Sequence, residues 1–280
     1  SSEEPDRRQV MFEKAGNSLE LFDLNKQENM RYFGSLNEEE WVGDLRSSYR
    51  YGDNNLIRMG ATYKDKSRTF RSTRFYYDVS RFNPEIEDIY QTSGFMGYDH
   101  IANGDIAIIR DQQPKDQYDA GHSIYAGFID AEYYPTANFL VNIGVRYEYS
   151  HQWVNYATDG GEAKRNEVNC HDFFPAMNLK YTVNDANSLR FSFSRTVTRP
   201  SFIEMAPFLY QESYGAAMIR GNAELKNGYN YNIDLRYERF DQQNSNNMFS
   251  ITGYAKILED PIERTQTLSG GAAVHSFQNA

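Results

Sequence analysis

The residues of this chain that could do chemistry are five histidines and one cysteine. They are His100, His122, His151, His171, His275 and Cys170. No two histidines have the His-x-x-x-His spacing of a helical metal site, and a single cysteine cannot form a disulfide within the chain. No combination of nucleophile, general base and orienting group emerges from so few residues. We therefore expect no enzyme, no metal site and no cofactor.

Polar residues, some of them charged, recur instead at nearly every second position of two stretches, Phe139–Ser150 and Tyr229–Glu238. The charged members are Arg146, Glu148, Asp234, Arg236 and Glu238. The apolar members of the first stretch are Phe139, Val141, Ile143, Val145, Tyr147 and Tyr149. Successive side chains of a strand point to opposite faces, so each stretch has one apolar and one polar face. Such strands fit either a sheet with a solvated back or a lipid-facing barrel with a wet lumen.

The elements that must position these residues are long alternating segments. We predict strands at Trp41–Tyr51, Leu56–Phe70, Ser123–Tyr134, Phe139–Trp153, Phe174–Val183, Ser188–Thr198, Tyr229–Phe240 and Phe249–Ile257, and a last one from Val274. Their lengths of roughly 9 to 15 residues exceed the 5 to 6 that are usual in soluble proteins. A tilted strand that crosses an outer membrane needs about 9 to 11 residues. Strand length therefore favours the barrel.

The predicted connections alternate between short and long. Short clusters rich in Gly, Pro, Asn and Asp lie at Gly52–Asn55, Pro135–Asn138, Asn184–Asn187 and Asp241–Asn247. Long connections lie at Arg71–His122, Val154–Phe173, Arg199–Gly228 and Glu259–Ala273. We therefore predict an all-β fold, a partial antiparallel transmembrane β-barrel of about 9–10 strands with short periplasmic turns and long extracellular loops.

Composition agrees with a barrel and excludes one class of partner. The chain has 18 Phe and 22 Tyr, and its mean hydropathy is −0.74. Low hydropathy is typical of barrels because only every second strand residue meets lipid, and the aromatics suit interface girdles. The net charge is −10 and the basic residues form no cluster, which argues against binding to nucleic acid.

The segment 1–280 is expected to be a single piece of barrel without a plug domain. Ser1–Gln9 lacks the apolar core of a signal peptide. Val274–Ala280 reads as the start of a strand, and an unpaired strand edge in lipid is costly. We expect further strands, and a plug, to lie outside this segment.

Several motifs of the second half resemble the barrel of TonB-dependent outer-membrane receptors. They are Arg195–Phe208, Arg220–Lys226, Asp172–Tyr181, Tyr229–Glu238, Leu258–Arg264 and the closing Ser276–Ala280. The upstream part, including Glu39–Leu45, is similar less specifically. The chain departs from the family's Gly-Asn-Pro-x-Leu-Lys-Pro pattern, because Ala223 and Asn227 occupy the two proline positions.

The resemblance implies a barrel of about 22 strands around an N-terminal plug. It also implies a TonB motor complex that acts through a plug and a box outside this chain. Outer-membrane lipid and a small nutrient ligand are the other implied partners, and a surface lipoprotein is a candidate partner. The implied location is the bacterial outer membrane.

Ligand contacts are expected from the long loops, since loops on a rigid wall carry recognition. The candidate residues are Trp153, Tyr156, Arg199, Tyr210, Tyr214 and Arg220. For Arg199 the favoured interpretation is an ion pair with a carboxylate of the lumen, and contact with a plug or an anionic substrate is the alternative.

The leading functional hypothesis is TonB-dependent uptake of a nutrient such as an iron chelate, a corrinoid or an oligosaccharide. Two alternatives stay open. A passive porin would use the same polar rows to line an open channel. A soluble surface-binding β-sandwich would instead bury the apolar rows between two sheets.

Overall fold

The computed structural model describes residues 6–52, 54–82, 84, 86, 88–158, 160–207, 209–210, 217–241, 247–269 and 272–280. Its main element is a 10-stranded sheet in the order β1-β4-β5-β7-β8-β9-β10-β13-β14, with β6 paired to β5. Its strands are β1 (Asp6–Gln9), β4 (Met30–Tyr51), β5 (Asn55–Asp78), β6 (Ala107–Asp111), β7 (Gln117–Thr136), β8 (Phe139–Ala157), β9 (Ala163–Asn184), β10 (Asn187–Thr198), β13 (Gly228–Phe240) and β14 (Met248–Glu259). All neighbours in this sheet are antiparallel. Each predicted strand from Trp41 to Ile257 lies within one of them.

The predicted apolar row of β8 faces outward. Ile143 and Val145 are 50% and 41% exposed, and Leu45 of β4 is 74% exposed. Side chains at the same outward positions of neighbouring strands, such as Ile129 and Leu235, are exposed too. A β-sandwich would place these side chains in a dry core between two sheets, so that alternative is wrong for the described residues.

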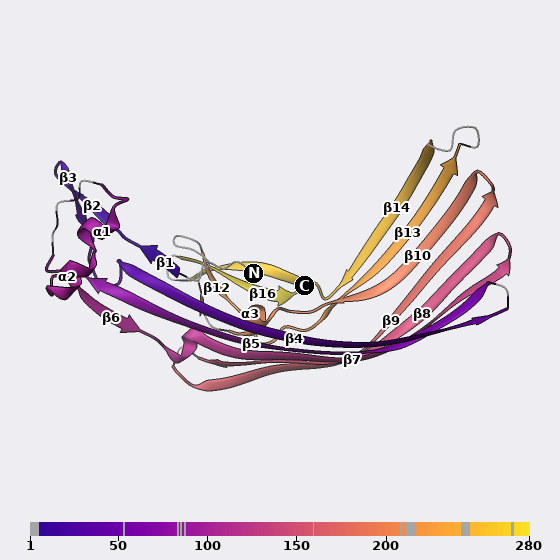
Figure 1. The fold of residues 1–280 in the computed structure, drawn as a ribbon, viewed down its shortest axis with the longest axis horizontal. Helices are drawn as coiled ribbons and strands as arrows, with labels where there is room; N and C mark the ends of the chain where they lie inside the picture. The colour runs from indigo at the N-terminus through magenta and orange to yellow at the C-terminus, as the bar shows by residue number, and fades with distance from the viewer. Residues whose placement is uncertain are drawn as a thin grey trace.

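The sheet is curved, and its concave face carries other parts of the chain (Figure 1). The helix α3 (Phe202–Met205) and the hairpin of β15 (Ile262–Ser269) and β16 (Ala272–Asn279) lie on that side. Within the described ranges the strand order runs from β1 to β14 without a pairing that joins these two strands. The prediction of a partial antiparallel barrel is confirmed, with the concave face toward the lumen.

The strand ends that flank the short turns gather at one end of the sheet, as predicted (Figure 1). These turns join β4 to β5, β7 to β8, β9 to β10 and β13 to β14. Gly52 adopts a φ of +61° in the first of them, a left-handed conformation that glycine reaches without steric cost. The connection between β5 and β7, with α1 and α2, lies at the opposite, outer end, whereas α3 and β12 of the connection between β10 and β13 lie on the concave side.

The predicted outer strand ends are too early, and one predicted long loop is wrong. Val154–Phe173 is mostly strand, because β8 runs to Ala157 and β9 begins at Ala163. Likewise β5 continues past Phe70 to Asp78. Beyond the membrane the outward side of a strand meets water, so its residues are polar and the apolar alternation fades although the ladder continues.

The C-terminal region also differs from its prediction. Val274 does not begin a further wall strand, since β16 belongs to a four-stranded sheet in the order β11-β12-β16-β15. Its other strands, β11 (Leu209–Tyr210) and β12 (Met218–Arg220), come from the connection between β10 and β13. Asp260 has a φ of +48° and precedes a proline, which ends β14. The side chain of Asn279 then binds the carbonyls of Lys226 (3.1 Å) and Asp260 (2.8 Å).

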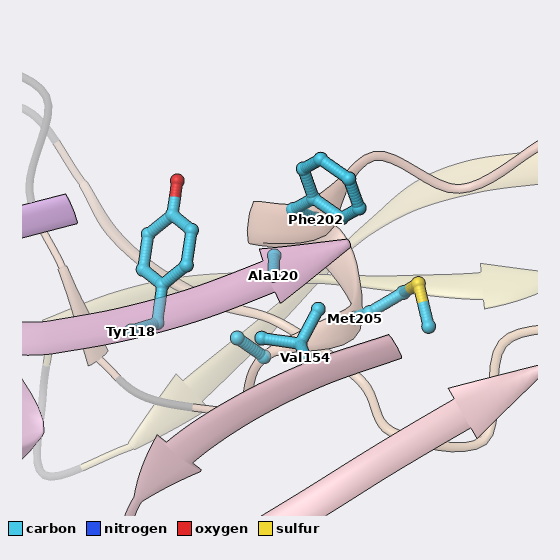
Figure 2. Close-up of a cluster of buried hydrophobic side chains, with 6 residues drawn as sticks. Tyr118, Ala120, Val154, Phe202 and Met205 are labelled. Carbon is cyan, nitrogen blue, oxygen red and sulfur yellow. The ribbon is translucent and has the colours of Figure 1, made fainter. Parts of the chain in front are cut away.

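A core lies between α3 and the concave face of the sheet (Figure 2). Its buried members are Tyr118, Ala120, Val154, Phe202, Met205 and Ala206. Phe202 and Met205 of α3 pack against Ala120 of β7 and Val154 of β8, and Met205 and Val154 are fully buried. Phe70, Tyr156, Val168 and Ile203 pack around this cluster. The connection after β10 is therefore folded inward onto the wall.

A second core forms a cap at the outer end of β4 and β5 (Figure 1). We define the cap as residues 10–29 together with the described part of 77–106. It contains the hairpin of β2 (Phe12–Ala15) and β3 (Ser18–Leu21) and the helices α1 (Thr92–Phe95) and α2 (Tyr98–Ala102). Its buried residues are Leu21, Tyr77, Val79, Phe95, Met96 and Ile106. None of the helices in the described ranges is long and apolar enough to cross a membrane.

The outward orientation of Ile143 predicts a strong penalty for charge at that position. We expect Ile143→Arg to lower the free energy of unfolding by about 2–4 kcal/mol, because an arginine near the bilayer centre must leave water. Asn142→Arg is the matched control, since its side chain points to the lumen. Urea titration of the full-length protein in lipid vesicles measures both, and equal losses would contradict the outward assignment.

The complete burial of Met205 predicts that α3 depends on it. We expect Met205→Ala to weaken the docking of α3 by about 2–5 kcal/mol, the usual range for a buried methionine truncated to alanine. Amide hydrogen exchange over residues 200–206 should rise accordingly. Met59→Ala removes the same atoms from the outward face, where Met59 is 48% exposed, and should leave that exchange unchanged. Identical exchange in both variants would exclude the packing role of Met205.

Candidate functional site

The candidate site is the concave, lumen-facing side of β4, β5, β7, β8 and β9 beneath α3. Strand register arranges its side chains in rows that cross these strands. One row is Asp44, Thr62, Ala126, Glu148 and Asp172. A second row, two rows nearer the outer end of the strands, consists of Glu40, Lys66, His122, Gln152 and Val168. Residues that are distant in sequence therefore face one space.

Alternating charges join β4 and β5 on this side. Lys66 lies between two glutamates, at 3.1 Å from Glu38 and 2.9 Å from Glu40. Arg68 also pairs with Glu38, and Lys64 lies 2.9 Å from Glu40. Exposed pairs of this kind contribute roughly 0.2–1 kcal/mol each. Their larger effect is to make this part of the lumen wall polar and nearly balanced in charge.

Glu148 anchors the connection between β10 and β13 to the lumen wall. Arg199 comes from the segment just before α3, and its Nη2 donates to Glu148 Oε2 at 2.7 Å. Arg146 donates from Nε to Glu148 Oε1 at 2.6 Å. Glu148 is only 8% exposed, so both charge-assisted bonds act with limited screening. The prediction that Arg199 pairs with a lumen carboxylate is confirmed.

Two side-chain amides of the wall bind the backbone around α3. Gln152 donates to the carbonyl of Pro200 at 2.7 Å, and Asn166 donates to the carbonyl of Met205 at 3.1 Å. The helix has its own capping box, in which the amide of Ser201 donates to Glu204 at 2.7 Å. With only four residues, α3 depends on these contacts and on its core for stability.

The wall splits between β9 and β10 at the level of this site. Their backbone pairing ends at Ala176 and Ser194, next to Pro175, which has no N–H to donate. Beyond that point side chains replace the ladder. Arg195 donates to the carbonyl of Phe173 at 2.9 Å, and the hydroxyl of Tyr229 donates to Asp172 at 2.6 Å.

The space beneath α3 retains unused hydrogen-bonding capacity. The ring nitrogen Nε2 of His122, the Oδ2 of Asp172 and the Nε of Arg199 are buried without a partner among the described residues. Such groups can hold water or a polar ligand. In the same part of the chain, no three His, Cys, Asp or Glu side chains gather as metal ligands. The geometry therefore suits binding of a polar group through hydrogen bonds.

The structure separates the candidate ligand residues from one another. Arg199 and Tyr156 face the lumen side, where Tyr156 packs against the α3 core. Trp153 lies on the outward face, where its ring is 4.6 Å from the Arg165 guanidinium. The glycine opposite Trp153, Gly121, leaves room for that ring, because a Cβ there would lie 2.7 Å from it.

The remaining candidates lie in the connection after α3. Tyr210 belongs to β11, where its backbone pairs with Ile219, and Arg220 ends β12 opposite Leu209. Tyr214 lies outside the described residues.

Sequence reasoning missed His122, Gln152 and Asp172 as lumen residues. Gln152 follows Glu148 and Ser150 at the same parity of β8, so alternation could have placed it. His122 was assigned to a loop, although it belongs to β7 and pairs in register with Gln152. The one sequence signal for a lumen-facing His122 is that it lies two positions before Ile124 and so on the same face of the strand.

Comparisons with solved structures identify the fold. The copper transporter OprC superposes on 90% of this chain with a TM-score of 0.57 at 12% sequence identity. The siderophore receptor PirA from Pseudomonas aeruginosa (TM-score 0.39, 12% identity, 98% of this chain) and the hemophore receptor HasR from Serratia marcescens (TM-score 0.45, 9% identity, 93% of this chain) are more distant. The chain spans 34%, 60% and 49% of these three proteins. The resemblance to TonB-dependent receptors is confirmed for the fold.

Sequence comparison gives the family. No curated protein sequence matches this chain. The model of the outer membrane protein beta-barrel family, by contrast, matches residues 87–280. This range contains β7, β8, β9 and α3, and so most of the candidate site. The chain therefore belongs to the outer membrane protein beta-barrel family, in the outer membrane of a bacterium.

Proposed function

We propose that this chain forms part of the wall of a receptor for active nutrient uptake across the outer membrane. The energy would come from the TonB motor complex, acting through a plug and a box encoded outside these 280 residues. The main support is the connection after β10, which folds inward over a polar, charged lumen wall and is anchored there by Glu148 and Arg199. A ligand entering from outside meets this connection before it reaches the wall below.

The same observation favours the proposal over the passive porin. A porin needs a continuous water channel, whereas the apolar core around Met205 stands on the lumen wall. A connection that folds into the lumen, as the one after β10 does, suits a site that closes around one ligand at a time. The wall then positions the segments, and the segments carry recognition.

The proposed ligand contacts are the lumen-side candidates Tyr156 and Arg199, with Tyr210, Tyr214 and Arg220 of the connection between α3 and β13. Trp153 faces outward beside Arg165, so we assign it to the outer aromatic girdle, where a tryptophan ring suits the lipid–water boundary. The cap is the proposed contact for a surface lipoprotein, because it lies at the outer end of the wall.

An iron chelate, a corrinoid and an oligosaccharide are the proposed classes of cargo. The lumen wall carries both signs of charge, which suits polar ligands in general rather than one class. The TM-score of 0.57 to OprC supports the fold, but at 12% identity the copper of that protein does not extend to this chain.

Energised uptake is the direct test. We expect a strain lacking the complete reading frame to lose accumulation of one labelled nutrient among a ferric chelate, cobalamin and a maltooligosaccharide. Complementation should restore it, and deletion of tonB in the complemented strain should abolish it again. Accumulation that continues at the same rate without tonB would identify a passive porin. A small sugar that enters through general porins is the control for membrane integrity.

The Glu148–Arg199 pair predicts a coupled effect on uptake. Glu148→Gln removes the carboxylate that Arg199 pairs with, and Arg199→Gln leaves Glu148 with Arg146 only, a loss of at most about 3–5 kcal/mol in either case. Each should therefore loosen the inward connection and lower the initial rate of nutrient uptake. In the double variant the two losses should not add, because the residues share one interaction. Lys180→Gln, on the lumen side of β9 near the short turns, is the control. Fully additive losses would contradict the anchoring role.

A further inference from the structure

The outward face of the wall contains a depression that the transport function does not use. Its floor is Ala61 and Gly127, and Leu45, Tyr63, Tyr125 and Tyr147 form its rim. We call it the outward depression. The depression is shallow and open to the outside: one part has a volume of about 570 Å³, and an adjoining part of about 480 Å³ shares Leu45 and Ala61 with the first.

Strand register creates this depression. Leu45, Ala61, Gly127, Tyr147 and Phe173 form one row across β4, β5, β7, β8 and β9. Large side chains occupy both neighbouring rows, with Met59 and Ile129 on the side of the short turns and Tyr63 and Tyr125 on the outer side. The two small residues therefore lie side by side within a surface of large ones.

The fold itself does not require glycine on this surface. A Cβ at Gly127 would have only one neighbour within 4 Å, the carbonyl oxygen of Gly60 at 3.8 Å, and a Cβ at Gly43 would have none. Neither has a positive φ. The lumen-facing Gly60 and Gly144 differ, since a Cβ there would lie 2.5 Å and 2.6 Å from neighbouring atoms. Glycine weakens a strand, and a glycine free of internal contacts leaves space for something outside the wall.

The location of the depression indicates which molecule fills the space. It continues the apolar surface that faces lipid, at a depth just below a group of neighbouring tyrosine rings. The ring centres of Tyr63 and Tyr125 are 5.0 Å apart, and those of Tyr125 and Tyr149 are 6.2 Å apart. Tyrosines in such girdles lie at the headgroup level, so the floor lies among acyl chains.

Polar groups stand immediately above the depression. The hydroxyl of Tyr147 is hydrogen-bonded to Nδ1 of His171 at 2.7 Å, and the ring of Tyr149 lies 4.8 Å from that of His171. These side chains can donate hydrogen bonds to the ester or headgroup oxygens of a lipid, while the apolar floor contacts its chain.

We propose that the outward depression binds one acyl chain of an outer-leaflet lipid, held as a resident lipid with its polar end at Tyr149 and His171. The acyl chain of this lipid fills the gap above Ala61 and Gly127. Lipids that exchange freely with the bilayer would fill it poorly, because they must also pack against the large side chains around it. This site is separate from the lumen site and does not depend on transport.

Native mass spectrometry of the full-length protein, extracted from the outer membrane in mild detergent, tests the proposal. We expect the wild type to retain one lipid per chain. Ala61→Phe fills the floor with a ring and should lower that occupancy by about tenfold or more, equivalent to at least 1.4 kcal/mol. Ala131→Phe is the matched control, because Ala131 faces outward on β7 but does not line the depression; its occupancy should equal that of the wild type.

Both variants add an apolar ring to a lipid-facing surface, so we expect both to fold. Heat-dependent mobility on a denaturing gel checks the barrel before the lipid is counted. Equal lipid retention in the wild type and Ala61→Phe would overturn the proposal. A dimer in the wild type that Ala61→Phe abolishes would also overturn it, because the depression would then be an interface between two copies of the chain.

Discussion

The structure depends on the requirement that backbone polar groups in a membrane find their partners within the protein. Long antiparallel ladders of backbone hydrogen bonds satisfy this requirement here. The longest, between β4 and β5, pairs every residue from Met30 to Tyr51. The ladder fixes the register, and the register fixes which side chains share a face. The outward apolar surface and the inward charged rows are therefore two results of one hydrogen-bonding pattern.

The lumen side shows what this pattern permits. Because its side chains are turned away from lipid, the wall can carry Glu148 and Asp172 next to each other in one row. Each carboxylate is then bound by a different partner, Arg199 for Glu148 and Tyr229 for Asp172. Both partners come from the chain beyond the point where β10 leaves β9. The local loss of backbone pairing and its replacement by side-chain contacts thus occur in the same place of the wall.

Much of the wall could be predicted from the sequence, because alternation is strong where one face meets lipid. The eight strands from Trp41 to Ile257 and the short turns were predicted for this reason. The signal fails where both faces meet water or protein, as in the outer parts of β8 and β9. It also cannot tell a wall strand from a strand of an inward hairpin, which is why β16 was misassigned. Among the site residues, Trp153 and Tyr156 are close in sequence but lie on opposite faces of β8, since they are an odd number of positions apart.

The cap has a consequence that follows from strand length. From Tyr63, at the outer girdle, β5 continues to Asp78, which is about 50 Å along the strand at about 3.3 Å per residue. The hydrophobic cluster of Leu21, Phe95 and Ile106 therefore stands well above the cell surface. The cap is therefore the part of the described chain that a large particle coming from outside reaches first, ahead of the charged rows of the lumen wall.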